Sequence, residues 1–240
     1  MPHIETPAGI RIRYDERGPA DGRPLVLAHG FGVGLEMWFP QFDALSRAHR
    51  LITWDARGHG GSSAPNDRES YTMSALAEDL RGLLEALDAT RDAVIGGMSF
   101  GGMIALQYAV DHAQDVHALV ISDSVPRDER APLSTSRWAD AYAGDPGLEG
   151  GMHAMATRPD LAPHLGTLGV PTLAIVGTDD ARILEGLPRL IDPLPRRRVV
   201  RLAGCGHGTS GQRPRAWNEA VLRFLADVDA GAPLGEDETV

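Results

Sequence analysis

Short apolar runs alternate with longer amphipathic stretches along most of the chain. Each run is rich in Val, Ile, Leu and Ala, and each ends at Gly or Ser. This pattern is typical of strands that are buried on both faces of a parallel sheet. The runs occupy residues 24–30, 50–58, 92–99, 117–124, 171–177 and 197–204. The segment "GIRIRYDERG" (9–18) instead alternates apolar with polar residues, which predicts an antiparallel strand at the edge of the sheet.

Helical periodicity fills the gaps between these runs. After Thr72, which is placed to cap a helix N-terminus, apolar residues recur at helical spacing on one stripe. The stripe consists of Met73, Leu76, Leu80, Leu83, Leu84 and Leu87. Residues 101–113 and 214–228 predict two further helices. Because strands alternate with helices through right-handed crossovers, the sequence predicts an α/β protein with a mostly parallel sheet covered on both faces.

One stretch, at about 127–160, interrupts this alternation. It has neither a buried strand nor a long amphipathic stripe, and it lies between the sixth and seventh core strands. We interpret it as a small lid inserted into a single domain that spans residues 1–240. Four of its larger side chains either line a substrate pocket or pack within the lid, and both alternatives stay open. They are Trp138, Tyr142, Met152 and Met155.

Composition and charge exclude several classes of protein. Hydrophobic residues make up 42% of the 240 residues, and the formal net charge is −10 with no Lys/Arg-rich block. Nucleic acid and anionic membranes are therefore poor partners. No run approaches the roughly 18 apolar residues of a membrane span, and the start has no leader pattern, so we expect a cytoplasmic protein. The single Cys205 excludes an intrachain disulfide, and the nine histidines show no ligand spacing, so we expect no metal or cofactor.

The segment "GGMSFGG" (96–102) places a serine at the junction of a predicted strand and a predicted helix. Gly97-Met98-Ser99-Phe100-Gly101 has the form G-x-S-x-G, in which small residues let strand and helix approach around a sharp turn that exposes the serine. Glycine turns with an incidental serine also occur. The strand and helix on either side favour a nucleophile at Ser99.

A nucleophilic serine needs a base and a carboxylate that orients the base. His207 follows the last predicted strand in "GCGHG" (204–208), at the edge of the sheet where parallel strands end. Asp180, after the strand at 171–177, is our choice for the carboxylate. Asp123, at the end of the preceding strand, and Asp179 are the alternatives.

The negative oxygen of a tetrahedral intermediate needs hydrogen-bond donors. The backbone N–H of Phe100 follows the nucleophile directly. The N–H of Phe31 lies in "HGFG" (29–32), after the strand at 24–30. These two amides are the predicted oxyanion-binding groups, and His29 is interpreted as a structural turn residue.

Taken together, these segments resemble the α/β-hydrolase superfamily over essentially the whole chain. The landmarks are "HGFG", "WDARGHGGSS" (54–63), "GGMSFGG", "PTLAIVGTDD" (171–180) and "GCGHG" followed by "RPRAWNEAVLRFL" (213–225). The resemblance implies an eight-stranded, mostly parallel sheet and a triad in the chain order Ser99, Asp180, His207. It also implies that Asp55, Arg57 and His59 belong to a structural loop near the site.

Within the superfamily, the chain looks most like small bacterial esterases, enol-lactonases and cofactor-free haloperoxidase-like hydrolases. We therefore expect hydrolysis of a carboxylic ester or lactone. Carbon-carbon hydrolases often carry a tryptophan after the histidine, which this chain lacks, and haloalkane dehalogenases and epoxide hydrolases have aspartate where this chain has Ser99. A carbon-carbon hydrolase, a cofactor-free perhydrolase and a slow-turnover ligand-binding or signalling protein are the alternatives.

Overall fold

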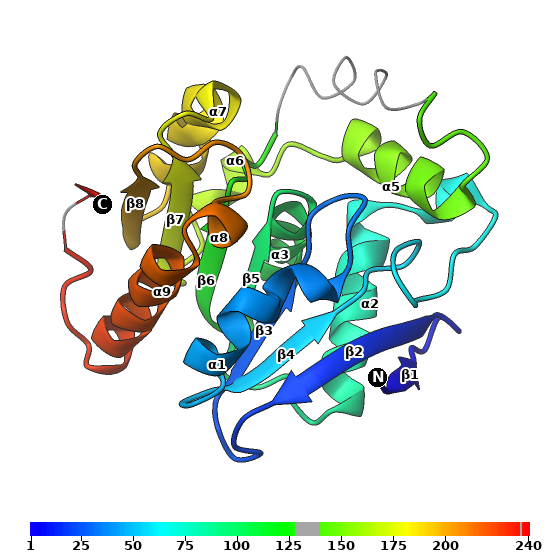
Figure 1. The fold of residues 1–240 in the computed structure, drawn as a ribbon, viewed down its shortest axis with the longest axis horizontal. Coiled ribbons are helices and arrows are strands. Elements are labelled where there is room, and N and C mark those ends of the chain that lie inside the picture. The colour runs from blue at the N-terminus through cyan, green and yellow to red at the C-terminus, as the bar shows by residue number, and fades with distance from the viewer. Residues whose placement is uncertain (128–139, 236) are drawn as a thin grey trace.

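The computed structural model describes residues 1–127, 140–235 and 237–240. Among these residues it contains one nine-stranded sheet in the order β1-β2-β4-β3-β5-β6-β7-β8-β9 (Figure 1). The strands are β1 His3–Glu5, β2 Arg11–Arg17, β3 Pro24–Ala28, β4 Arg50–Trp54, β5 Ala93–Met98, β6 Val116–Ser122, β7 Thr172–Gly177, β8 Arg197–Leu202 and β9 Glu238–Thr239. β1–β2 and β2–β4 are antiparallel, and all pairs from β4 to β9 are parallel. The predicted α/β-hydrolase fold is confirmed.

Two details of the sheet differ from the prediction. The sheet has nine strands instead of eight, because the tail forms β9 against β8. The alternating segment forms β2, but β2 is not the outermost strand, since β1 pairs along its far side. β1 and β9 have three and two residues, too few for a period to show.

Helices cover both faces of the sheet. The α-helices among the described residues are α1 Phe42–Leu45, α2 Met73–Ala86, α3 Phe100–Asp111, α5 Pro146–Thr157, α6 Ala162–Leu165, α7 Ala181–Ile191, α8 Thr209–Gln212 and α9 Pro214–Asp229. Short 3₁₀ helices are η1 Leu35–Gln41, η2 Arg68–Ser70 and η3 Ala113–Asp115. Side chains of α2, α3 and α7 fill the core on one face. Those of η1, α1 and α9 fill it on the other, so the sheet is buried on both sides.

The helix predicted after Thr72 is confirmed as α2. The Thr72 hydroxyl accepts a hydrogen bond from the Ala75 amide, which is the expected cap. Five of the six residues of the predicted stripe are buried, and Leu87 packs partly buried against them. Hydrophobic spacing therefore sets which face of α2 meets the sheet.

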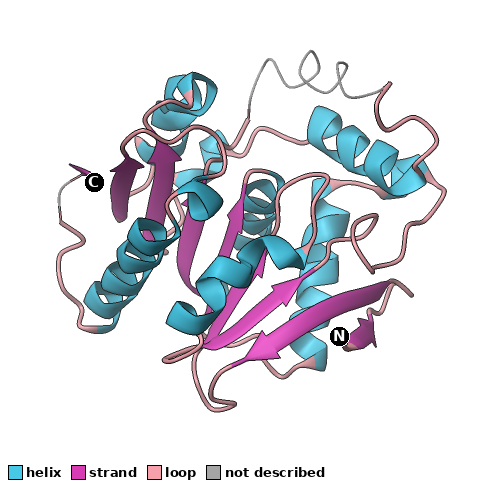
Figure 2. Ribbon diagram, viewed as in Figure 1, coloured by secondary structure: helices cyan, strands magenta, loops and turns pink. Residues whose placement is uncertain are grey.

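The central parallel strands point toward the side of the molecule on which α5 lies (Figure 2). Their carboxyl ends therefore lie along this edge of the sheet, where ligands of open α/β sheets bind. No helix in the described part of the chain is long and apolar enough to cross a membrane.

Candidate active site

Ser99 lies in a strained turn between β5 and α3. Its φ of 54° is in the left-handed region, which is rare for a residue with a side chain. The turn is possible because strand and helix nearly touch: a Cβ on Gly97 would lie 2.3 Å from the Gly101 carbonyl carbon. A Cβ on Gly101 would lie 2.0 Å from the Ala28 carbonyl oxygen of β3. The glycines of the motif are therefore required by contact, and the serine side chain projects from the turn.

His207 projects from the loop between β8 and α8. This loop approaches the end of β7 because Gly177 has no side chain; a Cβ there would lie 2.2 Å from the Cys205 carbonyl oxygen. The Asp179 amide donates to that same oxygen at 2.8 Å. The Gln212 side chain brackets the loop by accepting from the Gly206 amide and donating to the His207 carbonyl oxygen. The loop is thus fastened on both sides of the imidazole.

Asp180, His207 and Ser99 form one hydrogen-bonded chain. His207 Nδ1 lies 2.6 Å from Asp180 Oδ2, and His207 Nε2 lies 2.9 Å from Ser99 Oγ. A carboxylate only accepts, so Nδ1 carries the proton that it donates to Asp180. Nε2 of the neutral ring is then an acceptor for the Ser99 hydroxyl proton. The geometry suits removal of that proton by His207.

Asp180 is buried, yet the pKa of its carboxyl lies below the ordinary value. Burial alone raises this pKa, but the hydrogen bond and charge of His207, the amide of Ile183 and the charge of Arg182 outweigh burial. Asp180 also caps α7 through the Ile183 amide. The carboxylate is therefore held in its ionised form beside the imidazole.

Asp123, the alternative carboxylate, has different hydrogen-bond partners. Its Oδ2 accepts from the amides of Gly208 and Thr209, at 3.2 Å and 2.8 Å. Asp179, the other alternative, is exposed and accepts from the Thr178 hydroxyl. Of the three acidic candidates, Asp180 is the one that is hydrogen-bonded to the imidazole of His207. The contacts of Asp123 are between residues far apart in sequence, and no local pattern points to Thr209.

The predicted oxyanion-binding residues lie beside each other. The rings of Phe31 and Phe100 pack edge to face with centroids 6.0 Å apart. Phe100 is the first residue of α3, so its amide has no acceptor within the helix. The loop that carries Phe31 ends where the Leu35 amide donates to Asp55 at 2.7 Å. Asp55 also forms an ion pair with Arg13, at 3.0 Å, and it fixes the Phe31 loop through the Leu35 amide.

Two buried histidines support the Phe31 loop from the β4 side. The Ala56 amide donates to His29 Nε2, so Nδ1 carries the proton that is given to the Gly30 carbonyl oxygen. Burial lowers the pKa of His29 to about 4. Burial, with the nearby His29, lowers the pKa of His59 to about 3. Both rings are therefore neutral packing groups at neutral pH, as expected for a structural turn.

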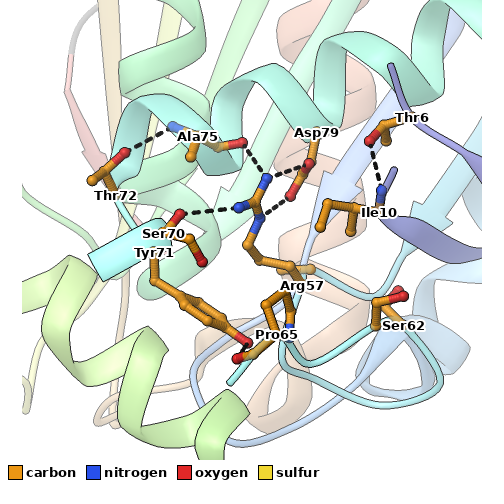
Figure 3. Close-up of polar contacts among 12 residues, drawn as sticks. Thr6, Ile10, Arg57, Ser62, Pro65, Ser70, Tyr71, Thr72, Ala75 and Asp79 are labelled. Atoms are coloured by element: carbon orange, nitrogen blue, oxygen red, sulfur yellow. Dashed lines mark hydrogen bonds and ion pairs between the residues drawn. The ribbon is translucent and has the colours of Figure 1, made fainter. Parts of the chain in front are cut away.

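Arg57 connects the loop after β4 to η2 and α2 (Figure 3). Its guanidinium binds both oxygens of Asp79, at 2.5 Å and 2.7 Å, and donates to the Ser70 carbonyl oxygen at 3.0 Å. Arg57 and Asp79 are both buried. Burial raises the pKa of Asp79, although the bond from Arg57 opposes this. The pair is a structural clamp, as the sequence interpretation of the loop implies.

The described part of the predicted lid segment packs on this loop through α5. A Cβ on Gly147 would lie 2.3 Å from the Gly58 carbonyl oxygen, and one on Gly150 would lie 2.4 Å from the Tyr71 ring. A Cβ on Gly151 would come within 2.9 Å of the Phe31 ring. These three glycines of α5 therefore let the helix pack directly on Gly58, Tyr71 and Phe31.

The four predicted lid residues differ in their surroundings. Tyr142 is half-buried and packs edge to face on Phe31, with centroids 5.6 Å apart. Met152 and Met155 are buried in the core cluster, which favours packing over pocket lining. Trp138 lies outside the described residues. Within the described ranges, no group of three or more His, Cys, Asp and Glu side chains is arranged to hold a metal ion.

Comparisons with known proteins agree with this architecture. The profile of the α/β hydrolase fold matches residues 23–145. A Variovorax paradoxus protein provisionally named carbamate hydrolase RutD is 31% identical, over 92% of this chain and 99% of its own. Among solved structures, an esterase from Thermogutta terrifontis has 26% identity and a TM-score of 0.85, over 95% of this chain and 98% of its own.

A second solved structure, the enol-lactonase from Burkholderia xenovorans LB400, has 26% identity and a TM-score of 0.80. It matches 94% of this chain and 100% of its own. The relative and the two solved structures thus match nearly the full length of the chain, and the profile matches residues 23–145. The chain therefore belongs to the α/β hydrolase fold family.

Proposed function

We propose that this hydrolase cleaves a carboxylic ester or lactone through an acyl-enzyme intermediate formed on Ser99. The observation that carries the proposal is the hydrogen-bonded chain from Asp180 through His207 to Ser99, at 2.6 Å and 2.9 Å. The strained turn at Ser99 supports it, as does the packing of Phe31 on Phe100, whose amides are the predicted oxyanion-binding groups. The likeness to an esterase and an enol-lactonase supports the substrate class.

The steps follow from the positions of the groups. His207 Nε2 takes the proton of the Ser99 hydroxyl as Oγ attacks the carbonyl carbon. The amides of Phe31 and Phe100 donate to the oxygen that becomes negative. His207 then gives the proton to the leaving oxygen, and water attacks the acyl-enzyme by the same route. Asp180 holds the imidazole in the required tautomer and balances its positive charge.

A carbamate is the second candidate substrate class. The 31% identity to the protein named carbamate hydrolase RutD favours it, and a carbamate carbonyl is attacked by the same groups. The two classes separate on a matched pair of substrates, p-nitrophenyl butyrate and p-nitrophenyl N-ethylcarbamate, in which an NH replaces the CH2 next to the carbonyl.

The test is a stopped-flow time course with p-nitrophenyl acetate and butyrate on the wild type and Ser99→Ala. The proposal expects a burst of nitrophenol followed by steady turnover, with both lost in Ser99→Ala. Turnover that persists in Ser99→Ala overturns the assignment of the nucleophile. A stoichiometric burst without turnover would instead support the ligand-binding alternative.

A further inference from the structure

One turn, Ser122–Ser124 at the carboxyl end of β6, holds the peptide groups on both sides of Ser99. The Ser122 carbonyl oxygen accepts from the Ser99 amide at 2.9 Å. The Ser124 hydroxyl donates to the Ser99 carbonyl oxygen at 2.9 Å. The position of the nucleophilic turn is therefore set by these two serines as well as by β5 and α3.

The middle residue of the same turn, Asp123, reaches the loop of His207. Its Oδ2 accepts from the Gly208 amide at 3.2 Å, the Thr209 amide at 2.8 Å and the Thr209 hydroxyl at 2.8 Å. A longer contact, at 3.4 Å, joins the same oxygen to the Ser122 hydroxyl. Gly208 and Thr209 directly follow His207. The carboxylate thus fixes the main chain at the point from which the imidazole projects.

The direction of the hydroxyl bonds can be assigned by counting protons. Thr209 has one hydroxyl proton and donates it to Asp123, so its oxygen accepts from the Ser122 hydroxyl at 3.0 Å, which is shorter than the 3.4 Å from that hydroxyl to Asp123 Oδ2. The Ser122 oxygen in turn accepts from Trp217 Nε1 at 3.1 Å. All four residues are buried. The network runs from the core helix α9 to the Asp123 carboxylate and ends there.

Two features of Asp123 lower the stability of the fold. Its φ of 48° lies in the left-handed region, and its Oδ1 is buried with no hydrogen-bond partner among the described residues. Burial raises the pKa of its carboxyl, although the amide and hydroxyl of Thr209 and the charge of His207 oppose this. A strained residue with a half-satisfied buried carboxylate is typical of a functional site.

We propose that Asp123 is a positioning residue that sets the separation between Ser99 Oγ and His207 Nε2. It does so by tying the His207 loop to the same turn that holds Ser99. Asp180 has a different role, because it bonds the imidazole itself and sets its tautomer and charge. This inference rests on the proposed function, since it concerns the geometry of the proton transfer from Ser99.

The test compares Asp123→Asn with Thr209→Val in p-nitrophenyl butyrate hydrolysis. A fluorophosphonate that labels Ser99 to completion counts the active sites, so kcat is obtained per folded site. Asn removes the negative charge, and Val removes the hydroxyl but keeps the amide. Because a misplacement of about 1 Å can slow a reaction about 100-fold, we expect kcat per site to fall 10- to 100-fold while KM changes less than about twofold.

Two further variants separate positioning from stability. Thr209→Ser, which retains a hydroxyl, should lose less of kcat than Thr209→Val. Asp79→Asn removes a buried carboxylate from the clamp with Arg57, and it should lower the melting temperature without lowering kcat per site. An unchanged kcat per site in both Asp123→Asn and Thr209→Val, whatever their stability, overturns the inference. If Ser99→Ala retains turnover, the proposed function has failed instead.

Discussion

Gly101 of α3 lies so close to Ala28 of β3 that a methyl group on its Cα would sit 2.0 Å from the Ala28 carbonyl oxygen. The new methyl group would project from the main chain of α3 onto the main chain of β3, so neither partner can turn aside. We predict that Gly101→Ala destabilises the protein by more than about 3 kcal/mol, beyond the usual cost of overpacking, and displaces the Ser99 turn. Urea unfolding and esterase activity measure the two effects.

Gly169 offers the matched control for this substitution. A Cβ there would meet no atom within 4 Å, so Gly169→Ala should change neither stability nor activity appreciably. Equal effects of the two substitutions would contradict the role given to the contact between Gly101 and Ala28.

Asp180→Asn should lower kcat by about 10³- to 10⁴-fold. An amide cannot both accept from Nδ1–H and balance the charge of the imidazolium, so His207 loses its orientation and its partner. The neighbouring Asp179→Asn is the control, because Asp179 is exposed and its side chain accepts from Thr178. Comparable losses in the two variants would refute the assignment of Asp180 as the orienting carboxylate. Steady-state hydrolysis of p-nitrophenyl butyrate gives both rates.

Asp79→Ala should cost about 3–5 kcal/mol of unfolding free energy, because it leaves the buried Arg57 guanidinium without its counter-charge. The double variant Arg57→Met, Asp79→Leu removes both charges and should recover a large part of that loss. Glu85→Ala breaks an exposed pair with Arg81 and should cost less than about 1 kcal/mol. A double variant that is less stable than Asp79→Ala would contradict the view that the loss comes from the uncompensated charge of Arg57.

Stability should fall between pH 6.5 and about 4 because of His29. Burial lowers its folded pKa to about 4 from the ordinary 6.5, so between these values the unfolded chain binds the proton and the folded chain does not. Its contribution is fully present above pH 6.5 and is lost as pH falls; at pH 5 the loss is about 2 kcal/mol. His59 acts with the same sign.

The measurement is the difference in unfolding free energy between pH 7 and pH 5. His29→Gln should reduce this difference, whatever its effect at pH 7. His164 is exposed, so His164→Gln should leave the difference unchanged. A pH slope that is the same in the wild type and His29→Gln would show that His29 does not carry it.

The sequence predicted the features that follow from the spacing of hydrophobic residues and from the topology of parallel strands. Buried runs located the main strands, and the rule that their carboxyl ends meet at one edge brought together Ser99, Asp180 and His207. It did not separate Asp180 from Asp123, since both end strands at that edge. Their roles differ because Asp180 contacts His207 Nδ1, whereas Asp123 contacts Thr209. The second contact joins residues that are 86 positions apart in the sequence.

Short elements and close contacts were also beyond the sequence. β1 and β9 are too short to show a period, and the glycine face of α5 carries no apolar stripe. The glycines of this helix pack on the loop after β4, while its Met152 and Met155 are buried in the core cluster. Such packing depends on a surface built by residues elsewhere in the chain, such as Tyr71 and Phe31.

The pairing of β9 with β8 has a consequence for self-association. Without it, β8 would present a row of unsatisfied amides and carbonyls beside the buried Val199 and Val200, a template for another chain. Glu238 and Asp237 hold the tail there through Arg223 and Arg201, in ion pairs that salt screens. The acidic tail therefore covers this edge of the sheet. A purification tag fused after Val240 would disturb the pairing of β9 with β8, at a place far from Ser99.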